Sequence, residues 1–508
     1  MFKKFISIVK LVNEAGKDNP NNIALQYEND HLSYSNFLSR AGAVSNYLLG
    51  MGLSKGESIA ILFDKSMEMV ISTFAVLNTG LVYLPIDPRT PQKRLEFILM
   101  DSGTRYIMTT RQLQKKYHLN ISDCIFIEEI DCNSNTAYQI NCNINGCDPA
   151  YAVYTSGSTG KPKGVLISHY SLSNLAISQK KIFSIDKNSR ILQFASWGFD
   201  ASVSEWSTAL ISGATLCILP IRRTNSKLSI DEHIAKYIGK YNIDVLTLPP
   251  SIIATIKFPI IPKVIVSAGE PCTSKVINMY AERTKLLNAY GPSECTVCST
   301  VMKCDKKYPP STIGQTIDNV KVQILDDNLQ EVPIGTTGEI YISGAGVGIG
   351  YINNPQLTSK NFFLHPFENG ERLYKTGDMA RYLKDKNIEY LGRIDSQIKL
   401  QGCRIELDEI TKVIVSYPIV QHAFIFLNFN KELKKNVIVA SILLNNNSVH
   451  DSFDKVKLKI RKYIRNYLPG YMTPKYFLFL KEFPLTDNGK IDKTILSNML
   501  ESNYETNV

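Results

Sequence analysis

A glycine-rich loop between two apolar runs is the feature that most constrains this chain. Residues 154–164 read YTSGSTGKPKG and combine three glycines, four hydroxyl side chains and two lysines. Glycines let backbone N–H groups approach a polyphosphate, and hydroxyl and ammonium groups add further donors. The apolar runs at residues 151–154 and 165–168 predict short strands on either side. We therefore expect a phosphate cradle held between two rigid elements.

Two other interpretations of the loop fit less well. A flexible linker rarely carries two lysines and a proline between strands. A Walker A loop needs glycine, four residues and then Gly-Lys-Ser/Thr, whereas Thr155 stands at the first glycine position and Pro162 follows Lys161. The loop therefore belongs to another class of phosphate-binding sequence.

Composition excludes several classes of function. The net charge of +10 is carried mainly by scattered lysines, so we expect no nucleic-acid partner. No stretch approaches the roughly 18 apolar residues of a membrane helix. The N-terminal apolar run is interrupted by Lys10, which predicts a helix rather than a signal peptide. The 10 cysteines are irregularly spaced, and Cys295 and Cys298 form a lone CxxC, so we expect reduced thiols, no zinc and a cytoplasmic enzyme.

The order of apolar runs predicts the fold. Runs alternate with helical stretches between residues 59 and 110, and again in the runs at 191–195, 214–219, 245–248 and 263–266. This alternation is typical of parallel strands covered by helices. Beyond Ser311, short strands and glycine-rich turns predict a β subdomain. We therefore predict an α/β fold: a large N-terminal domain of α/β layers plus a β subdomain (1–394), followed by a small mobile α+β C-terminal domain (395–508).

The loop resembles the phosphate-binding signature of the adenylate-forming (AMP-binding) superfamily. That superfamily includes acyl-CoA ligases, luciferases and the adenylation domains of nonribosomal peptide synthetases (NRPS). The resemblance extends from about Leu32 to Ile491, and the further motifs NAYGPSE, YKTGD, GRID and PLTDNGKID follow in the family's order. It implies that ATP and Mg²⁺ bind, that an acid is activated as its adenylate, and that the C-terminal domain rotates about a hinge at Asp395.

The resemblance also implies which residues bind ATP. The loop would contact the β and γ phosphates, Asn288 the adenine amino group, Tyr290 and Tyr390 the two sides of adenine, and Asp378 with Arg393 the ribose. A carboxylate suits the two ribose hydroxyls because it offers two acceptor oxygens. The expected ATP-binding set is Thr155, Ser156, Gly157, Ser158, Thr159, Gly160, Lys161, Asn288, Tyr290, Asp378, Tyr390 and Arg393.

Three further positions follow from the same alignment of motifs. Glu294 matches a glutamate that helps to hold Mg²⁺. Lys490 matches a mobile catalytic lysine that reaches the substrate carboxylate and the charge developing at the α-phosphate. Gln401 is a departure, because relatives usually carry arginine there; it puts in doubt a contact of the second half-reaction.

The substrate pocket of the resembled family maps onto mostly small residues. Asp200 would bind an α-ammonium group, although taken alone it fits the N-cap of a helix that starts near Ser202. Small alanines and apolar valines suit a flat ring, the Ser204 hydroxyl could pair with a phenol, and the set looks like one associated with tyrosine, with phenylalanine second. The expected substrate-binding residues are Asp200, Ala201, Ser204, Thr247, Val266, Ala268, Ala289, Val297 and Cys298.

The resemblance therefore implies ATP-dependent adenylation of an amino acid, with release of pyrophosphate. The aminoacyl group would then pass to the phosphopantetheine thiol of a carrier protein, expected in trans because no carrier motif follows Lys490. Two alternatives in the same superfamily are a D-alanine-carrier protein ligase and an acyl-CoA ligase, and Asp200 argues against the latter because it would repel a fatty or aryl acid. An alternative of another class is a catalytically silent nucleotide-binding subunit.

Overall fold

The computed structural model describes residues 5–131, 143–157, 160–220, 228–366, 370–430, 435–445 and 452–505. Two residues of the predicted ATP-binding set, Ser158 and Thr159, lie outside these ranges. The chain divides into two compact units, which are described separately. Unit 1 comprises Met1–Pro88, Ile98–Thr155 and Gly164–Asp395, and unit 2 comprises Arg89–Phe97, Ser156–Lys163 and Ser396–Val508.

The larger sheet of unit 1 has 14 strands. They are β1 (Ile23–Tyr27), β2 (Asp30–Ser33), β9 (Arg190–Gln193), β10 (Thr215–Ile218), β11 (Val245–Leu248), β12 (Val264–Ala268), β13 (Lys285–Tyr290), β14 (Thr300–Lys303), β15 (Thr312–Thr316), β16 (Val320–Leu325), β17 (Thr337–Gly344), β19 (Phe362–Leu364), β20 (Arg372–Tyr382) and β21 (Ile388–Arg393). Their order is β16-β17-β20-β21-β15-β14-β13-β12-β11-β9-β10-β1-β2, with β19 paired to β20.

This sheet has a parallel part and an antiparallel part. Strands β10, β9, β11, β12 and β13 pair in parallel, and they contain the apolar runs expected to form buried strands. From β14 onwards the pairs β14–β15, β15–β21, β16–β17, β17–β20 and β20–β21 are antiparallel. Parallel strands covered on both faces read as continuous apolar runs. The α/β layers and the β subdomain predicted from sequence are therefore confirmed.

A second sheet of unit 1 has seven strands in the described part of the chain, and two of them flank the phosphate loop in sequence. Its members are β3 (Ser58–Leu62), β4 (Val82–Ile86), β5 (Tyr106–Thr109), β6 (Cys124–Phe126), β7 (Pro149–Thr155), β8 (Lys163–Ser168) and β18 (Gly350–Tyr351). The order is β18-β8-β7-β4-β3-β5-β6, so the two strands that flank the loop are neighbours.

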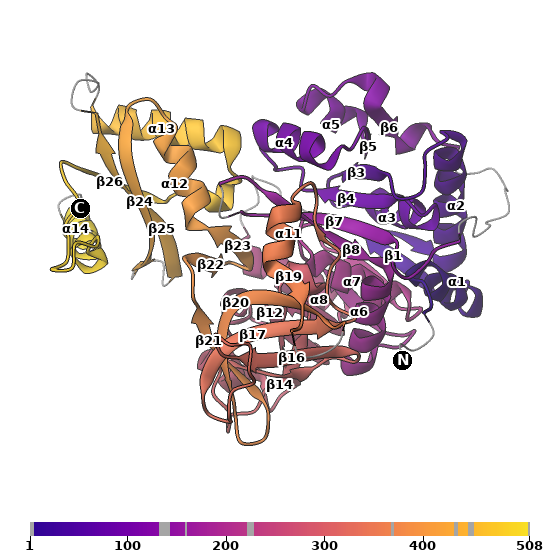
Figure 1. Ribbon diagram of the computed structural model, residues 1–508. Coiled ribbons are helices and arrows are strands. Elements are labelled where there is room, and N and C mark those ends of the chain that lie inside the picture. The colour runs from indigo at the N-terminus through magenta and orange to yellow at the C-terminus, as the bar shows by residue number, and fades with distance from the viewer. Residues whose placement is uncertain are drawn as a thin grey trace. The chain divides into compact units, whose positions relative to one another are not determined.

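Helices cover both sheets (Figure 1). They are α1 (Ile8–Asp18), α2 (Tyr34–Gly50), α3 (Met67–Asn78), α4 (Gln92–Ser102), α5 (Arg111–Lys116), α6 (His169–Ile182), α7 (Ala201–Leu210), α8 (Ile230–Tyr241), α9 (Pro250–Ile253), α10 (Ser274–Tyr280) and α11 (Pro355–Asn361), with short 3₁₀ turns at Ile121–Asp123, Ile127–Glu129 and Ser293–Cys295. The N-terminal segment forms α1, as predicted, and the Ser7 hydroxyl accepts a capping bond from Lys10 N at 3.2 Å. Among the described residues, no helix is both long and apolar enough to cross a membrane.

The part of unit 2 after Asp395 is a small α+β domain. Its strands are β22 (Gln397–Leu400), β23 (Cys403–Glu406), β24 (Val420–Asn430), β25 (Lys435–Leu444) and β26 (Tyr476–Leu480), and its helices are α12 (Leu407–Val415), α13 (Phe453–Tyr467), α14 (Lys493–Glu505) and the 3₁₀ turn Gly470–Met472. Strands β24, β25 and β26 form one sheet. Ile425 packs with residues of α12 and α13, whereas the next residue, Phe426, packs with Leu496 and Leu500 of α14. The sheet therefore buries both faces, as alternation along a strand requires.

A buried glutamate on α7 holds the loop that follows β9. Glu205 is 2% exposed. Its carboxylate accepts hydrogen bonds from Phe194 N and Ala195 N, each at 3.1 Å, and from Gln193 Nε2 at 3.0 Å. Burial raises the pKa of Glu205 to about 7, although Lys65 and these hydrogen bonds act in the opposite direction.

Two other contacts fix the same loop, residues 194–200. The Ser196 hydroxyl donates to the Asp87 carboxylate. The indole N–H of Trp197 donates to Thr73 Oγ1 at 3.1 Å, and both of these side chains are buried. The loop is thus bound at successive residues to three different helices or strand ends, which restricts the position of Asp200 at its end.

We expect Glu205→Gln to remove a pH-dependent part of the protein's stability. An acid whose pKa rises from its ordinary value of 4.5 to about 7 on folding stabilises the fold fully below 4.5. That contribution is lost as the pH rises through 7, whereas a glutamine amide is neutral throughout. The melting temperature of the parent minus that of the variant should therefore fall by about 2–4 °C between pH 5 and pH 8. Calorimetry at each pH measures this difference in melting temperature, and Glu14→Gln, at an exposed glutamate, is the control. Melting temperatures of parent and Glu205→Gln that change in parallel with pH would contradict the expectation.

Candidate active site

Four parallel strands bring the predicted substrate residues to one edge of the larger sheet. Strands β9, β11, β12 and β13 run in the same direction, so their carboxyl ends lie together, which is where open α/β sheets bind ligands. In the register of the strands, Thr247 lies beside Val266, and Ala268 lies beside Ala289. Val266 is buried, whereas the two alanines are partly exposed. Small side chains therefore line an accessible edge of the sheet.

The residues predicted from the GFDASVSEW segment lie at the start of α7. Asp200 immediately precedes the helix, and its side chain makes no capping hydrogen bond to it. The N-cap alternative thus lacks the interaction that defines a cap. Asp200 is partly exposed, and its charge adds to burial in raising the pKa of Tyr151. Ala201 begins the helix and Ser204 is buried one turn later.

The other two substrate positions lie in a strained turn before β14. Thr296 and Val297 have φ angles of 55° and 68°, in the left-handed region that β-branched residues rarely adopt. Gly291 lies against this turn: a Cβ added there would lie 2.6 Å from Val297 O and 2.7 Å from Cys298 Cα. The Thr296 hydroxyl donates to Gly346 O at 2.6 Å and secures the turn from the other side. Close packing therefore holds Val297 and Cys298 in place.

Asp378 is the centre of the predicted ribose contacts. Its Oδ1 accepts from Arg393 Nη1 and its Oδ2 from Tyr290 Oη, at 2.7 and 2.5 Å. Asp378 and Arg393 are direct partners in the β20–β21 register. A carboxylate has about four acceptor sites, so two further donors, such as two ribose hydroxyls, can still be accommodated.

The two tyrosines expected on either side of adenine contact each other. The ring centroids of Tyr290 and Tyr390 are 6.0 Å apart and the rings are inclined by 42°. This is the separation of an aromatic pair in contact, so an adenine between the rings requires one of them to move. Asn288 is buried beside them in β13, and its Nδ2 donates to Thr312 O at 2.8 Å.

Glu294, the predicted Mg²⁺ ligand, is completely buried in the 3₁₀ turn after β13. Its Oε1 accepts a hydrogen bond from Tyr351 Oη at 2.8 Å, a partner that no sequence motif predicted. Among the described residues, no three His, Cys, Asp or Glu side chains gather as a metal site. Mg²⁺ usually takes only one or two carboxylates together with substrate phosphates. The donor chemistry thus fits an ion that arrives with ATP.

In the described part of the phosphate loop, one buried hydroxyl has no hydrogen-bond partner and one N–H is bonded to a carboxylate of the chain. Thr155, the last residue of β7, has a buried Oγ1 without a hydrogen-bond partner among the described residues. Within unit 2, Gly157 N donates to the Glu409 carboxylate at 3.3 Å, and Glu409 is also paired with Arg94 at 2.6 Å. This loop N–H can thus serve an anionic acceptor, as a phosphate cradle requires, and in this structure the Glu409 carboxylate occupies it.

Other loop residues and Lys490 also lie in unit 2. Ser156 Oγ donates to Arg404 O at 3.0 Å, Gly160 has a φ of 83°, and Lys161 Nζ is 5.8 Å from the centre of the Phe97 ring. Lys490 is exposed in a tight hairpin, in which Thr486 N donates to Lys490 O at 2.7 Å and Gly489 has a φ of 72°.

The predicted hinge residue ends unit 1 and holds a predicted ribose contact. Asp395 accepts two hydrogen bonds from Arg393, from Nε and Nη2, each at 2.7 Å. This bidentate pair links the GRID motif internally. Gln401, the departure from the family pattern, lies with Gly402 in the turn between β22 and β23, where both residues have positive φ angles of 53° and 78°. That geometry is the one a two-residue hairpin turn needs.

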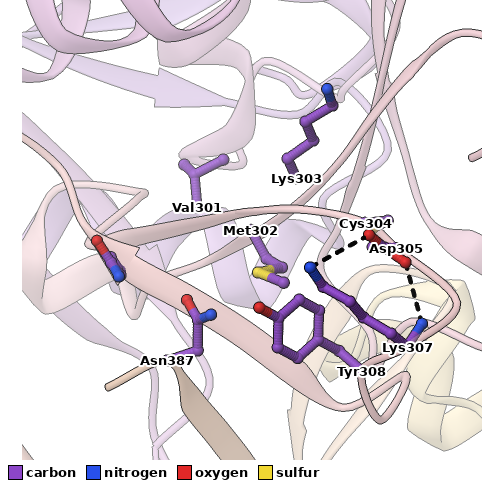
Figure 2. Close-up of a pocket in the computed structure, with 9 residues that line it drawn as sticks. Val301, Met302, Lys303, Cys304, Asp305, Lys307, Tyr308 and Asn387 are labelled. Carbon is purple, nitrogen blue, oxygen red and sulfur yellow. Dashed lines mark hydrogen bonds and ion pairs between the residues drawn. The ribbon is translucent and has the colours of Figure 1, made fainter. Parts of the chain in front are cut away.

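A hollow of about 360 Å³ lies elsewhere in unit 1. Figure 2 shows Met302, Tyr308 and Asn387 around it, with Lys307 paired to Asp305. The hollow lies at the Lys303 end of β14, and Lys303 pairs with Leu287 of β13. The other end of β14 is the one near the candidate site, because Thr300 pairs there with Tyr290. None of the predicted site residues lines it.

Two family models match this chain. The model described as AMP-binding enzyme matches residues 12–352, and the model described as AMP-binding enzyme C-terminal domain matches residues 409–490. Together they include most of the predicted ATP and substrate positions and end at Lys490.

Two relatives are similar to this chain in sequence, and one solved structure is similar to it in fold. Over 494 residues the chain is 34% identical to Gramicidin S synthase 1 of Brevibacillus brevis, covering 96% of this chain and 44% of that protein. It is 35% identical to Bacitracin synthase 3 of Bacillus licheniformis, covering 96% of this chain and 8% of that protein. The chain thus spans less than half the length of these relatives. An artificially fused Adenylation-PCP di-domain NRPS from Klebsiella oxytoca has a similar fold, with a TM-score of 0.80 at 22% identity over 94% of this chain and 86% of that one.

Gly291→Ala tests whether close packing holds the strained turn. A Cβ at this position meets backbone atoms at 2.6 and 2.7 Å, so the turn at Val297 must shift. Overpacking of this kind costs about 1–3 kcal/mol. We expect a lower melting temperature for Gly291→Ala by calorimetry, and little change for Gly50→Ala, where a Cβ would have no atom within 4 Å. Equal melting temperatures for the two variants would contradict this account of the turn.

Proposed function

Because the chain belongs to the AMP-binding enzyme family, we propose that it activates an amino acid, preferably L-tyrosine, as the aminoacyl adenylate. A carboxylate oxygen of the amino acid attacks the α-phosphorus of ATP, the bond to the β-phosphate oxygen breaks, and pyrophosphate leaves. In a second step the phosphopantetheine thiol of a carrier protein attacks the aminoacyl carbonyl carbon, and AMP leaves. The carrier protein and the thiol transfer are part of the proposal.

The observation that carries the proposal is Asp200 at the carboxyl edge of the sheet. Its loop is bound by Glu205, Asp87 and Thr73, yet its own carboxylate makes no cap to α7. A carboxylate fixed in this way beside small apolar residues suits the ammonium group of an α-amino acid. It would disfavour an acid that lacks the ammonium group, because the charge would then be left uncompensated.

The apolar residues of the edge favour a flat ring. Ala268 and Ala289 are strand neighbours and would leave the space above them open, while Val266 and Val297 would supply apolar walls. The hydroxyl of Ser204 gives this environment one polar group. Tyrosine matches both features, since its ring is apolar and its phenol is polar.

The ATP contacts follow the arrangement around Asp378. Asp378 would accept from the ribose hydroxyls while Arg393 and Tyr290 hold its two oxygens, and Asn288 with Tyr390 would contact the base. The loop N–H groups would bind phosphate oxygens. Mg²⁺, held in part by Glu294, would neutralise negative charge on the phosphates. These residues orient the α-phosphate for in-line attack, which is the main requirement of phosphoryl chemistry.

Lys490 is proposed as the catalytic residue of adenylation. A lysine ammonium near the substrate carboxylate and the α-phosphate would stabilise the negative charge that develops in the transition state. Its exposed hairpin with a glycine in the left-handed region suits a residue that must move.

Lys490→Ala should lower the rate of pyrophosphate exchange into ATP by about 10²- to 10³-fold, because it removes one charge contact that acts on the transition state. ATP should still bind, since its contacts are made by other residues. The exchange assay gives the rate and equilibrium dialysis gives the affinity for ATP. Lys481→Ala, at another exposed lysine of unit 2, serves as the control. Exchange at the parental rate in Lys490→Ala would remove the residue from the mechanism.

The substrate is tested by exchange assays across the twenty amino acids, D-alanine and deaminated tyrosine. We expect L-tyrosine first, phenylalanine second, and D-alanine essentially inactive. Phenylalanine lacks the phenol and leaves one buried hydrogen bond unmade, which costs about 1–3 kcal/mol. This cost sets the expected preference in kcat/KM for tyrosine over phenylalanine. Asp200→Ala should abolish the preference for tyrosine over its deaminated acid, whereas Asp327→Ala, in an exposed turn, should preserve it.

Each other result has a defined meaning. A maximum with D-alanine would identify a D-alanine-carrier protein ligase, and exchange with the deaminated acid alone would favour an acyl-CoA ligase. No exchange with any acid would indicate a catalytically silent nucleotide-binding subunit. Unchanged selectivity in Asp200→Ala would restore the structural role of this residue at the start of α7.

A further inference from the structure

A buried glutamine on α6 is bonded to one of the proposed substrate residues. Gln179 is 2% exposed and Ser204, on the neighbouring helix α7, is 4% exposed. The Ser204 hydroxyl donates to Gln179 Oε1 at 2.5 Å. The two residues lie 25 positions apart in the chain, and only the packing of α6 on α7 brings them together.

The same amide also meets a second proposed substrate residue. Cys298 Sγ donates to Thr300 O at 3.5 Å, so its single hydrogen is already used. Burial raises the pKa of the Cys298 thiol to about 12, and the nearby Gln179 side chain lowers this pKa in part. The amide oxygen of Gln179 therefore faces Ser204, and its side chain lies near Cys298.

This arrangement determines what Ser204 can offer to a ligand. A serine hydroxyl has one hydrogen and two lone pairs. Since the hydrogen is directed to Gln179, what remains for a substrate is the acceptor capacity of Oγ. A hydrogen-bond donor on the substrate would be satisfied there, whereas an acceptor or an apolar group of the same size would not.

We propose that Gln179 is a specificity-determining residue: it directs the Ser204 hydroxyl as an acceptor, so that the site selects aromatic amino acids with a hydrogen-bond donor at the para position. The proposal rests on the proposed amino-acid activation and deepens it. Gln179 acts through Ser204 and is a positioning residue. The selected chemical class includes tyrosine and 4-amino-L-phenylalanine and excludes 4-methyl-L-phenylalanine, which has nearly the same shape without a donor.

The test compares substrates of equal size in pyrophosphate exchange. The readout is the ratio of kcat/KM for tyrosine to kcat/KM for 4-methyl-L-phenylalanine, which a general loss of activity does not change. In the parent we expect a ratio of about 10 or more, since one buried donor is left without its partner in the methyl compound. 4-Amino-L-phenylalanine should be accepted ahead of the methyl compound.

Two variants and their combination then assign the effect. Gln179→Leu should lower the ratio severalfold, because the Ser204 hydroxyl is no longer held with its lone pairs towards the substrate and can turn away from the phenol. Ser204→Ala, which removes the acceptor itself, should lower the ratio by about tenfold. The double variant should lower it no further than Ser204→Ala, since Gln179 acts only through Ser204. Gln179→Met preserves the volume of the side chain and replaces Gln179→Leu if that variant does not fold, as judged by its melting temperature.

The outcomes separate this inference from the proposed function. If tyrosine is activated but the parental ratio is close to one, or if Gln179→Leu and Gln179→Met retain the parental ratio, the inference is overturned and the proposed function stands. An unchanged ratio in Ser204→Ala overturns it as well, as do effects that multiply in the double variant. A parent that shows no exchange with tyrosine overturns both proposals.

Discussion

Parallel pairing of β9, β11, β12 and β13 is the constraint on which the candidate site depends. Because the strands run in one direction, their carboxyl ends share an edge, and strand ends that are nearly a hundred positions apart in the chain lie along it. A short connection follows each strand, and its length and polar residues can suit a ligand without disturbing the sheet. The α7 start, the β12 and β13 ends and the turn before β14 are all built in this way.

Three carboxylates of unit 1 illustrate how the surroundings of one chemical group decide its role. Glu205 is buried among backbone and amide N–H donors with Lys65 nearby, and its pKa of about 7 leaves it half protonated near pH 7, so it serves as a structural anchor. Asp378 is paired with Arg393 and accepts from a tyrosine, which fixes both oxygens in a defined direction. Asp200 lies at a partly exposed helix start without a cap. Burial therefore makes Glu205 a structural anchor, and pairing with a cation makes Asp378 a fixed hydrogen-bond acceptor. The anchored loop leaves Asp200 as a charged group for a contact with a ligand.

Much of the fold could be predicted because it is encoded locally. Apolar runs such as residues 245–248 lie in strands, one of the helical stretches expected between residues 59 and 110 forms α3, and the N-terminal run interrupted by Lys10 forms α1. The positions of the site could be suggested by motifs in the order of a known family. Gln179 could not, because it lies in an ordinary helical pattern and gains its meaning only from the packing of α6 on α7. Tyr351 and Glu409 were missed for the same reason, whereas Glu205 had a signal: it is a lone acid in an otherwise uncharged helix.

The left-handed Val297 has a consequence for how the substrate range of such a protein can change over generations. A β-branched residue held at a φ of 68° stores about 1–3 kcal/mol of strain. Exchange for asparagine or glycine would release that strain while removing an apolar wall, so the loss of packing is offset. The same exchange at Val266, inside β12, offers no such compensation and leaves a cavity. Of these two apolar positions, the one in the turn can therefore be exchanged at a lower cost in stability than the one in the strand.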